Sequence, residues 1–214
     1  MTIFSQLCKG DLPTLSSKQL CQLGGLLYDT DSFIFPAAFG DRETAIKILT
    51  ALISQNVDSM FSIDRFFVAE TEHGDFVGLI LWIKGPLKWS AEHLRTVAQT
   101  NNLVLPSSFQ NVYKEYFSRY HDTPDQTVAI LNVCVTAKQR GKGIGTQMMS
   151  AFCQALSRYK MELCTLANNT PAVRLYEKLG FFTVDQIAGF ALGPTKPDCL
   201  VMARKSTLAI TPNI

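Results

Sequence analysis

Hydrophobic residues recur at helical spacing in two segments of the first third of the chain. In the first segment, residues 16–28, leucines recur at intervals of three and four behind two serines that can cap a helix. The second segment begins after Asp41, and its apolar stripe consists of Ala45, Ile46, Leu49, Leu52 and Ile53. Both segments are predicted to be helices. The aromatic, proline-containing residues 29–40 between them are expected to form an ordered loop.

Strand-like patterns begin at residue 66. Two runs rich in β-branched and aromatic residues, 66–72 and 76–84, flank a glycine-containing turn and predict a β-hairpin. The apolar run 128–135 is continuous, which is typical of a strand buried on both faces. Further strands are predicted at residues 161–166, 181–190 and 199–204.

Helical patterns separate the later strands. The predicted helices cover residues 89–101, 109–120, 144–159 and 171–179. The stripe on the second of these is aromatic, and we interpret it as part of the core in preference to a ligand pocket. In the last helix, Pro171 stands at the first position and Gly180 lies just past the end, as helix termini favour. A hairpin followed by alternating helices and strands predicts a mixed sheet in a layered α/β domain.

The chain is long enough for one full hydrophobic core. We predict a single domain over residues 1–206, with a helical insertion at about 85–126 and a C-terminal tail at 207–214. The insertion separates the predicted hairpin from the buried strand that follows it. Our hypothesis is that it walls the site of an acceptor substrate.

Composition narrows the classes of partner. Of the 214 residues, 47% are hydrophobic and 18% are charged, and a net charge of +2 gives no indication of a nucleic-acid partner. The low charged fraction is compatible with a homodimer. We predict no membrane-spanning helix and no signal peptide, and we expect a cytoplasmic protein. Six widely spaced cysteines favour reduced thiols over a disulfide framework, and three dispersed histidines predict no metal site.

A glycine-rich segment joins the buried strand 128–135 to the helix after it. Glycines at 141, 143 and 145 let the backbone approach a ligand closely, and the helix that starts there directs its positive end at the same point. Together with Arg140 and Lys142 they predict a site for a pyrophosphate. The spacing matches neither the Walker A loop nor the dinucleotide GxGxxG. The alternative is a turn that only packs a helix on a strand.

Two motifs carry a resemblance to a known family. Arg140-Gly-Lys-Gly-Ile-Gly145 resembles the acetyl-CoA signature of the GCN5-related N-acetyltransferase (GNAT) superfamily, [QR]-x-x-G-x-[GA]. The segment Asn169-Thr-Pro-Ala-Val-Arg-Leu-Tyr-Glu-Lys-Leu-Gly-Phe181 resembles the second motif of that superfamily, N-x-x-A-x-x-x-Y-x-x-x-G-F. The resemblance implies a three-layer α/β domain with a mixed, splayed central β-sheet flanked by helices. It also implies transfer of an acetyl group from acetyl-CoA to a primary amine, with no metal.

The resemblance assigns roles to the matching positions. Val133 and Val135 would offer backbone groups to the pantetheine arm of acetyl-CoA, and Asn169 would bind that arm or cap the helix after it. The pyrophosphate would be held by Arg140, Gly141, Lys142, Gly143, Ile144, Gly145 and Thr146. Tyr176 would lie near the thioester sulfur as general acid, because acyl transfer to an amine expels a thiolate that a hydroxyl can protonate or stabilise. The alternative for Tyr176 is an ordinary core aromatic.

The base that would deprotonate the amine is missing from the pattern. The strand 128–135 contains no Glu or Asp, and the remaining candidates are Glu70, Glu72 and His121, each of which has a simpler reading as a solvent-facing residue. Cys134 is interpreted as an inert core thiol because no histidine is near it in the sequence. The missing acid keeps open a second reading, a non-catalytic acyl-CoA-binding or regulatory module. The acceptor itself, whether a small molecule or a peptide, stays open.

Overall fold

The computed structural model describes residues 1–55, 57–87, 90–188 and 198–207, and only the backbone of residues 119–121. In this part of the chain a seven-stranded sheet has the order β1-β2-β3-β4-β5-β7-β6. The strands are β1 Thr2–Gln6, β2 Phe66–Thr71, β3 Phe76–Lys84, β4 Thr127–Val135, β5 Lys160–Leu166, β6 Phe182–Ile187 and β7 Cys199–Arg204. Neighbouring strands are antiparallel except β4 and β5, which run parallel.

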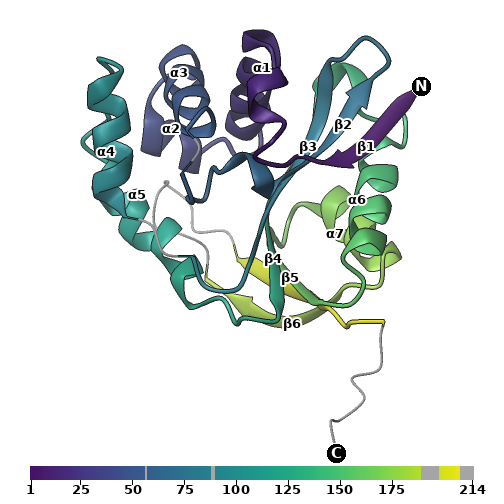
Figure 1. Cartoon of the computed structure of the whole chain (residues 1–214). Coiled ribbons are helices and arrows are strands. Elements are labelled where there is room, and N and C mark those ends of the chain that lie inside the picture. Colours follow the sequence, from purple (N-terminus) through teal and green to yellow (C-terminus); the bar gives the residue numbers. More distant parts are fainter. Residues whose placement is uncertain (56, 88–89, 189–197, 208–214) are drawn as a thin grey trace, which may run out of the picture.

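Helices cover both faces of the sheet (Figure 1). The α-helices are α1 Ser17–Tyr28, α2 Ile34–Phe39, α3 Arg42–Ile53, α4 Ala91–Thr100, α5 Phe109–Glu115, α6 Ile144–Ala155 and α7 Thr170–Lys178. Short 3₁₀ turns occupy Leu12–Thr14, Ile63–Arg65, Phe117–Asp122 and Ala137–Gln139. One hydrophobic cluster joins α1 to α5 with one face of the sheet, and a second joins α6 and α7 with the other. The predicted three-layer α/β architecture is confirmed.

The central sheet splays between its two parallel strands. Strands β4 and β5 pair only where Thr127–Ile130 faces Lys160–Leu163. Beyond this point β4 continues along β3 as far as Val135, while β5 continues along β7 as far as Leu166. The two strands therefore diverge at the end where the glycine-rich segment begins. The prediction of a mixed, splayed sheet is confirmed.

Helix caps explain several of the predicted boundaries. Ser16 and Gln19 form a reciprocal capping box at the start of α1. Asp41 accepts hydrogen bonds from the backbone N–H groups of Glu43 and Thr44 at the start of α3, and Ser90 caps α4 in the same manner. These side chains satisfy N–H groups that have no partner within the helix.

The expectation of a loop at residues 29–40 is wrong, because Ile34–Phe39 forms α2. The side chain of Asp31 accepts hydrogen bonds from the N–H groups of Phe33 and Ile34 just before this helix. Pro36 lies in the first turn, where its missing N–H would have had no partner in the helix. Burial of four apolar side chains, Ile34, Phe35, Ala38 and Phe39, then stabilises a helix too short to persist alone.

Two further differences from the predictions concern strand β1 and the end of the aromatic helix. Strand β1 is not indicated by the sequence pattern, and it forms as an edge strand that pairs with β2. The aromatic helix predicted at 109–120 ends at Glu115, and the chain continues as a 3₁₀ turn from Phe117. The phenyl ring of Phe117 packs against Phe39 and Phe61, and this contact with other elements favours the change of direction. The interpretation of the aromatic stripe as core is confirmed for Phe109, Val112, Tyr116 and Phe117.

The predicted tail, 207–214, lies outside the described residues except for Thr207, whose N–H donates to the carbonyl of Ser157. None of the described helices is both long enough and apolar enough to span a bilayer.

Candidate functional site

The edge of β4 that faces the splay carries free backbone groups. Thr136 donates its N–H to the carbonyl of Val77 at 2.8 Å, so this residue faces β3. Because alternate residues of an antiparallel strand bond to the same neighbour, Val135 and Val133 direct their N–H and C=O groups to the opposite side, into the gap next to β5. The carbonyl of Val135 accepts a hydrogen bond of 2.9 Å from Nε of Arg140. The other groups can bind an extended ligand as a further strand would.

The glycine-rich segment adopts the conformation that its composition predicts. Gly141 and Gly143 have φ angles of +76° and +80°, a region that residues with a Cβ rarely adopt. A Cβ placed on Gly141 would meet no atom within 4 Å, so the backbone there is open to a ligand. Gly143 caps α6 without any side-chain hydrogen bond to its first turn. The first N–H groups of α6 are therefore available to an anion, at the positive end of the helix dipole.

A cavity of about 790 Å³ lies over this segment, and we name it the loop cavity. It is lined by the predicted cofactor residues Val133, Val135, Arg140, Gly141, Gly143, Ile144, Gly145, Thr146 and Asn169. Lys142 does not line it, and its ammonium group instead donates to the side chain of Gln139 at 3.0 Å. Asp29, Thr30 and Gln139 also line the cavity and are not indicated by either motif.

Asn169 combines the two roles that the sequence left open. Its side-chain oxygen accepts a hydrogen bond of 3.4 Å from the N–H of Ala172 and so caps α7. The residue also lines the loop cavity. Because the cap uses the oxygen, the amide N–H₂ group is left to bind a ligand.

A second, smaller cavity of about 150 Å³ occupies the gap between β4 and β5, and we name it the gap cavity. Thr30, Val133 and Asn169 line both cavities, so the two adjoin. Its wall includes Tyr176 from α7 and Tyr116, which directly follows α5. Tyr176 of the second motif and Tyr116 of the insertion thus line the same cavity.

Tyr176 is 8% exposed and packs against Phe181 with ring centroids 6.0 Å apart. Burial raises the pKa of its hydroxyl to about 12. The phenol is therefore neutral at physiological pH and can donate a hydrogen bond into the gap cavity. The two readings of this residue are compatible, because the ring belongs to the core cluster and the residue also lines the gap cavity.

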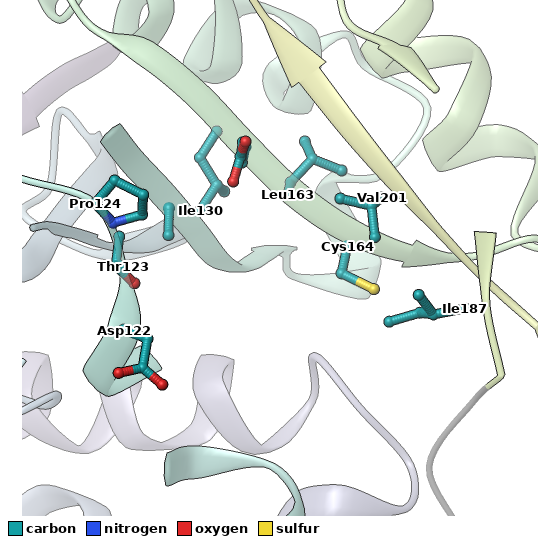
Figure 2. Close-up of a pocket in the computed structure, with 10 residues that line it drawn as sticks. Asp122, Thr123, Pro124, Ile130, Leu163, Cys164, Ile187 and Val201 are labelled. Atoms are coloured by element: carbon teal, nitrogen blue, oxygen red, sulfur yellow. The ribbon is translucent and has the colours of Figure 1, made fainter. Parts of the chain in front are cut away.

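A third cavity of about 250 Å³, the groove, lies over β5 and β7 (Figure 2). Figure 2 shows Asp122, Thr123 and Pro124 across this space from Ile187. Cys164 lines both the groove and the gap cavity, so the two meet at this side chain. Most of the groove lining is apolar, with Asp122 and Glu162 as its carboxylates. The end of the 85–126 insertion thus forms one wall.

The candidate bases on the hairpin lie away from these cavities. Glu72 pairs with the N-terminal ammonium group at 3.2 Å, and Glu70 lies near the side chain of Gln19. Neither residue lines any of the three cavities. The side chain of His121 lies outside the described part of the structure. The carboxylate that does line the gap cavity is Asp31, which sequence reasoning missed because nothing in its neighbourhood marks it.

The cysteines of the site do not favour nucleophilic chemistry. No disulfide is found among the six cysteines, which all lie in the described part of the chain. Burial raises the pKa of the Cys134 thiol, which disfavours the thiolate that a nucleophile requires. The interpretation of Cys134 as an inert core thiol agrees with this.

Comparison with known families identifies the group of proteins to which this architecture belongs. The sequence model of the acetyltransferase (GNAT) family matches residues 54–181, more than half of the chain. The chain belongs to the GNAT acetyltransferase family. Acetyl-CoA-dependent N-acetylation is the general reaction of this family. No curated protein sequence matches this GNAT protein closely enough to count as a relative.

Solved structures share the fold at low sequence identity. An N-acetyltransferase from Staphylococcus aureus Mu50 is 17% identical with a TM-score of 0.63, over 94% of this chain and 99% of that one. The ribosomal-protein-S18-alanine N-acetyltransferase from Escherichia coli is 15% identical with a TM-score of 0.57, over 100% of this chain and 99% of that one. A chain of the NatC complex bound to Gag peptide and CoA is 14% identical with a TM-score of 0.56, over 95% of this chain and 97% of that one. At these identities the likeness supports the GNAT fold.

Proposed function

We propose that this GNAT protein transfers the acetyl group of acetyl-CoA directly to a primary amine. The observation that carries the proposal is the junction of the loop cavity and the gap cavity at Thr30, Val133 and Asn169. A cofactor that binds in the first cavity would place its far end in the second, next to Tyr176. The two adjoining cavities therefore offer a binding site for the cofactor next to a site for the reaction.

The residues of the loop cavity fit acetyl-CoA. The first turn of α6, without a side-chain cap, and the guanidinium of Arg140 suit the pyrophosphate. The free backbone edge at Val133 and Val135 suits the amide groups of the pantetheine arm, and the N–H₂ group of Asn169 suits its carbonyls. In this assignment Lys142 contributes charge near the cavity mouth and no direct contact.

In the proposed reaction the amine nitrogen forms a bond to the acetyl carbon and the carbon–sulfur bond breaks. The starting ammonium loses two protons in all, one of which ends on the thiolate of CoA while the other goes to solvent. Tyr176 acts on the leaving sulfur. With a pKa of about 12 it is a weaker acid than a thiol, whose pKa is about 8.5 for cysteine. Its role is thus to donate a hydrogen bond to the developing thiolate. If Tyr176 passes its own proton to the sulfur, the phenolate must at the same time take a proton from solvent.

The acceptor reaches the gap cavity through the groove. The groove and the gap cavity share Cys164, whereas the groove and the loop cavity share no lining residue. This route keeps the amine and the cofactor on separate paths, as direct transfer in a ternary complex requires. Residues 122–124 and Tyr116 give the insertion its proposed role as a wall of the acceptor site.

The test separates an enzyme from a non-catalytic acyl-CoA-binding module. The protein is incubated with acetyl-CoA and a panel of primary amines that includes 2-phenylethylamine, a lysine-containing peptide and a peptide with a free N-terminus. Free thiol and acetylated product are both measured. We expect amine-dependent thiol release with one acetylated product per thiol. Binding of acetyl-CoA without release of thiol for any amine would favour the module.

Tyr176→Phe tests the catalytic assignment. We expect kcat to fall by about 10- to 100-fold, since a hydrogen bond to a developing anion is lost, while the Kd for acetyl-CoA changes little. Tyr159→Phe is the matched control, because Tyr159 is a partly buried tyrosine that lines none of the three cavities. Equal rates for wild type and Tyr176→Phe would remove the hydroxyl from the mechanism.

A further inference from the structure

Asp31 lies in the loop that joins α1 to α2, at the proposed reaction site. This residue lines the gap cavity together with Tyr176, although the two are far apart in the sequence. Within the described chain it is the carboxylate that lines this cavity, while Asp122 and Glu162 line the groove beyond Cys164. A cationic acceptor that arrives through the groove therefore meets Asp31 last.

The hydrogen bonds of Asp31 fix its orientation and leave one oxygen unused. Oδ1 accepts hydrogen bonds of 2.6 Å from the N–H groups of both Phe33 and Ile34. In the part of the chain that the structure describes, no donor to Oδ2 is found. The side chain is thus held by one oxygen, and the second can accept a hydrogen bond from a ligand.

The loop that carries Asp31 is anchored on both sides. The hydroxyl of Thr30 donates to the carbonyl of Leu27 at 2.6 Å and accepts a hydrogen bond of 3.0 Å from Nδ2 of Asn132. Asn132 belongs to β4, the strand that forms one wall of the gap. The position of Asp31 is therefore tied to the splayed strand itself.

The charges around the gap cavity favour a cation beside Asp31. The neighbouring carboxylate, Asp29, is neutralised by a two-pronged pair with Arg42, at 3.1 and 3.0 Å. The other titratable groups that line the cavity are Tyr116 just after α5, Cys164 from β5, Cys199 from β7 and Tyr176 from α7. Among the described residues that line it there is no lysine, arginine or histidine. Within the described lining of this cavity, Asp31 is therefore the group suited to accept a hydrogen bond from a cationic ligand.

We infer that Asp31 binds the ammonium group of the acceptor and takes the first proton that this group loses. The inference rests on the proposed function and specifies its acceptor as a cationic primary amine. An N–H proton of the ammonium passes to Oδ2 of Asp31 and from there to solvent. The nitrogen lone pair that is freed attacks the acetyl carbon, and the second proton leaves the nitrogen as the new amide forms. Asp31 thus supplies the base that neither β4 nor the hairpin provides.

Asp31→Asn tests the inference with little change to the fold, because the asparagine oxygen can accept the same two backbone hydrogen bonds. The probes are 2-phenylethylamine and O-benzylhydroxylamine, which have nearly the same shape. Only the first is positively charged at pH 7. We expect kcat/KM for 2-phenylethylamine to fall by about 100-fold at pH 7, the range typical of a lost general base. With O-benzylhydroxylamine, kcat/KM should stay within about twofold.

The pH profile adds a readout that a purely structural role would not move. In Asp31→Asn, kcat/KM for 2-phenylethylamine should rise about tenfold per pH unit between pH 7 and pH 9, because the fraction of free amine rises by that factor. The matched control is Asp41→Asn. Asp41 caps α3 through the same kind of contact, with Oδ1 accepting from the N–H groups of Glu43 and Thr44 at 3.0 and 3.1 Å, and it lines none of the three cavities.

The outcomes distinguish the two proposals. If wild type acetylates 2-phenylethylamine and Asp31→Asn does so equally well, or if the variant loses both probes equally, the inference about Asp31 is overturned and the proposed function stands. If wild type acetylates only O-benzylhydroxylamine, the cationic acceptor is overturned. If wild type binds acetyl-CoA and releases no thiol with any amine, the proposed function itself fails.

Discussion

Asn132, in the splayed part of β4, donates a hydrogen bond of 3.0 Å to the hydroxyl of Thr30, which lies 102 residues earlier in the chain. Asn132 is 9% exposed, so this bond satisfies a polar group that would otherwise be buried without a partner. It joins the loop after α1, which lines both the loop cavity and the gap cavity, to the splayed strand β4. The distance between the two proposed substrates is thus set in part by one side-chain contact.

We predict that the Asn132–Thr30 bond stabilises the fold and positions the acceptor. Asn132→Ala, Thr30→Val and the double variant form a cycle whose coupling energy, from urea unfolding, should be about 1 kcal/mol. Asn132→Ala should also raise KM for the amine several-fold and leave the Kd for acetyl-CoA within about twofold, because Asn132 lines the gap cavity and not the loop cavity. Additive effects of the two substitutions on stability would contradict this account.

The conformation of Gly143 gives a test of the cofactor site. Gly143→Leu should abolish acetyl-CoA binding, since a side chain at this position would project into the loop cavity where the pyrophosphate binds. Binding is measured by isothermal titration calorimetry. The φ angle of +80° also makes any side chain strained there, at a cost of about 1–2 kcal/mol.

Gly74 supplies a control for that strain. It has the same φ angle of +80° in the turn between β2 and β3, and it lines none of the three cavities. Gly74→Leu should lower the free energy of unfolding by a similar amount without weakening acetyl-CoA binding. Retained binding in Gly143→Leu would exclude the loop as the pyrophosphate site.

The backbone conformation at the proposed cofactor site could be predicted because its determinants are local. The glycines at 141 and 143, the uncapped start of α6 and the cap at Asn169 all lie within short segments, where backbone conformation follows from residue type. Lys142 is the exception among the predicted residues, because it does not line the loop cavity. Its position in the motif did not reveal that its long side chain turns to Gln139.

The proposed acceptor side could not be predicted because it depends on contacts between distant segments. The sequence around Asp31 has no signature, and the residue comes to the site only because the loop after α1 is bonded to Asn132. The same applies to α2, whose residues have no helical pattern strong enough to outweigh their proline and aromatics. It is stabilised by what packs on it, including the contact of Phe39 with Phe117.

The two roles of Asn169 can be separated by the choice of substitution. Asn169→Asp keeps the oxygen that caps α7 and adds a charge that the helix N-terminus favours, so stability should be unchanged or slightly higher. It removes the N–H₂ donor, and we expect the Kd for acetyl-CoA to rise by about tenfold. Thermal unfolding and calorimetry measure the two effects.

Asn169→Ala should lose both roles, with a stability cost of about 1 kcal/mol in addition to the weaker binding. Ser90→Ala is its control, since Ser90 caps α4 through a bond of 3.3 Å to the N–H of His93 and lines none of the three cavities. Unchanged acetyl-CoA affinity in Asn169→Asp would leave Asn169 as a cap alone.

The raised pKa of Tyr176 makes the stability of the protein depend on pH above pH 10. An unfolded tyrosine ionises near pH 10, whereas burial raises the folded pKa to about 12, so the folded state holds this proton more tightly. The stabilisation is fully present below pH 10 and is lost as pH rises from about 10 to about 12. Tyr176→Phe has no such proton. Between pH 9 and pH 11 wild type should therefore lose about 1 kcal/mol more than the variant, as measured by urea unfolding.

Other groups with raised pKa values, Arg42, Lys47, Tyr113, Cys134 and Cys153, are present in both proteins and cancel in this difference. Parallel losses of stability in wild type and Tyr176→Phe would mean that the phenol is hydrated and has an ordinary pKa. A hydrated phenol would have to give up its bond to water before it could donate to the thiolate. The same measurement therefore decides whether Tyr176 is desolvated in advance for the role proposed for it.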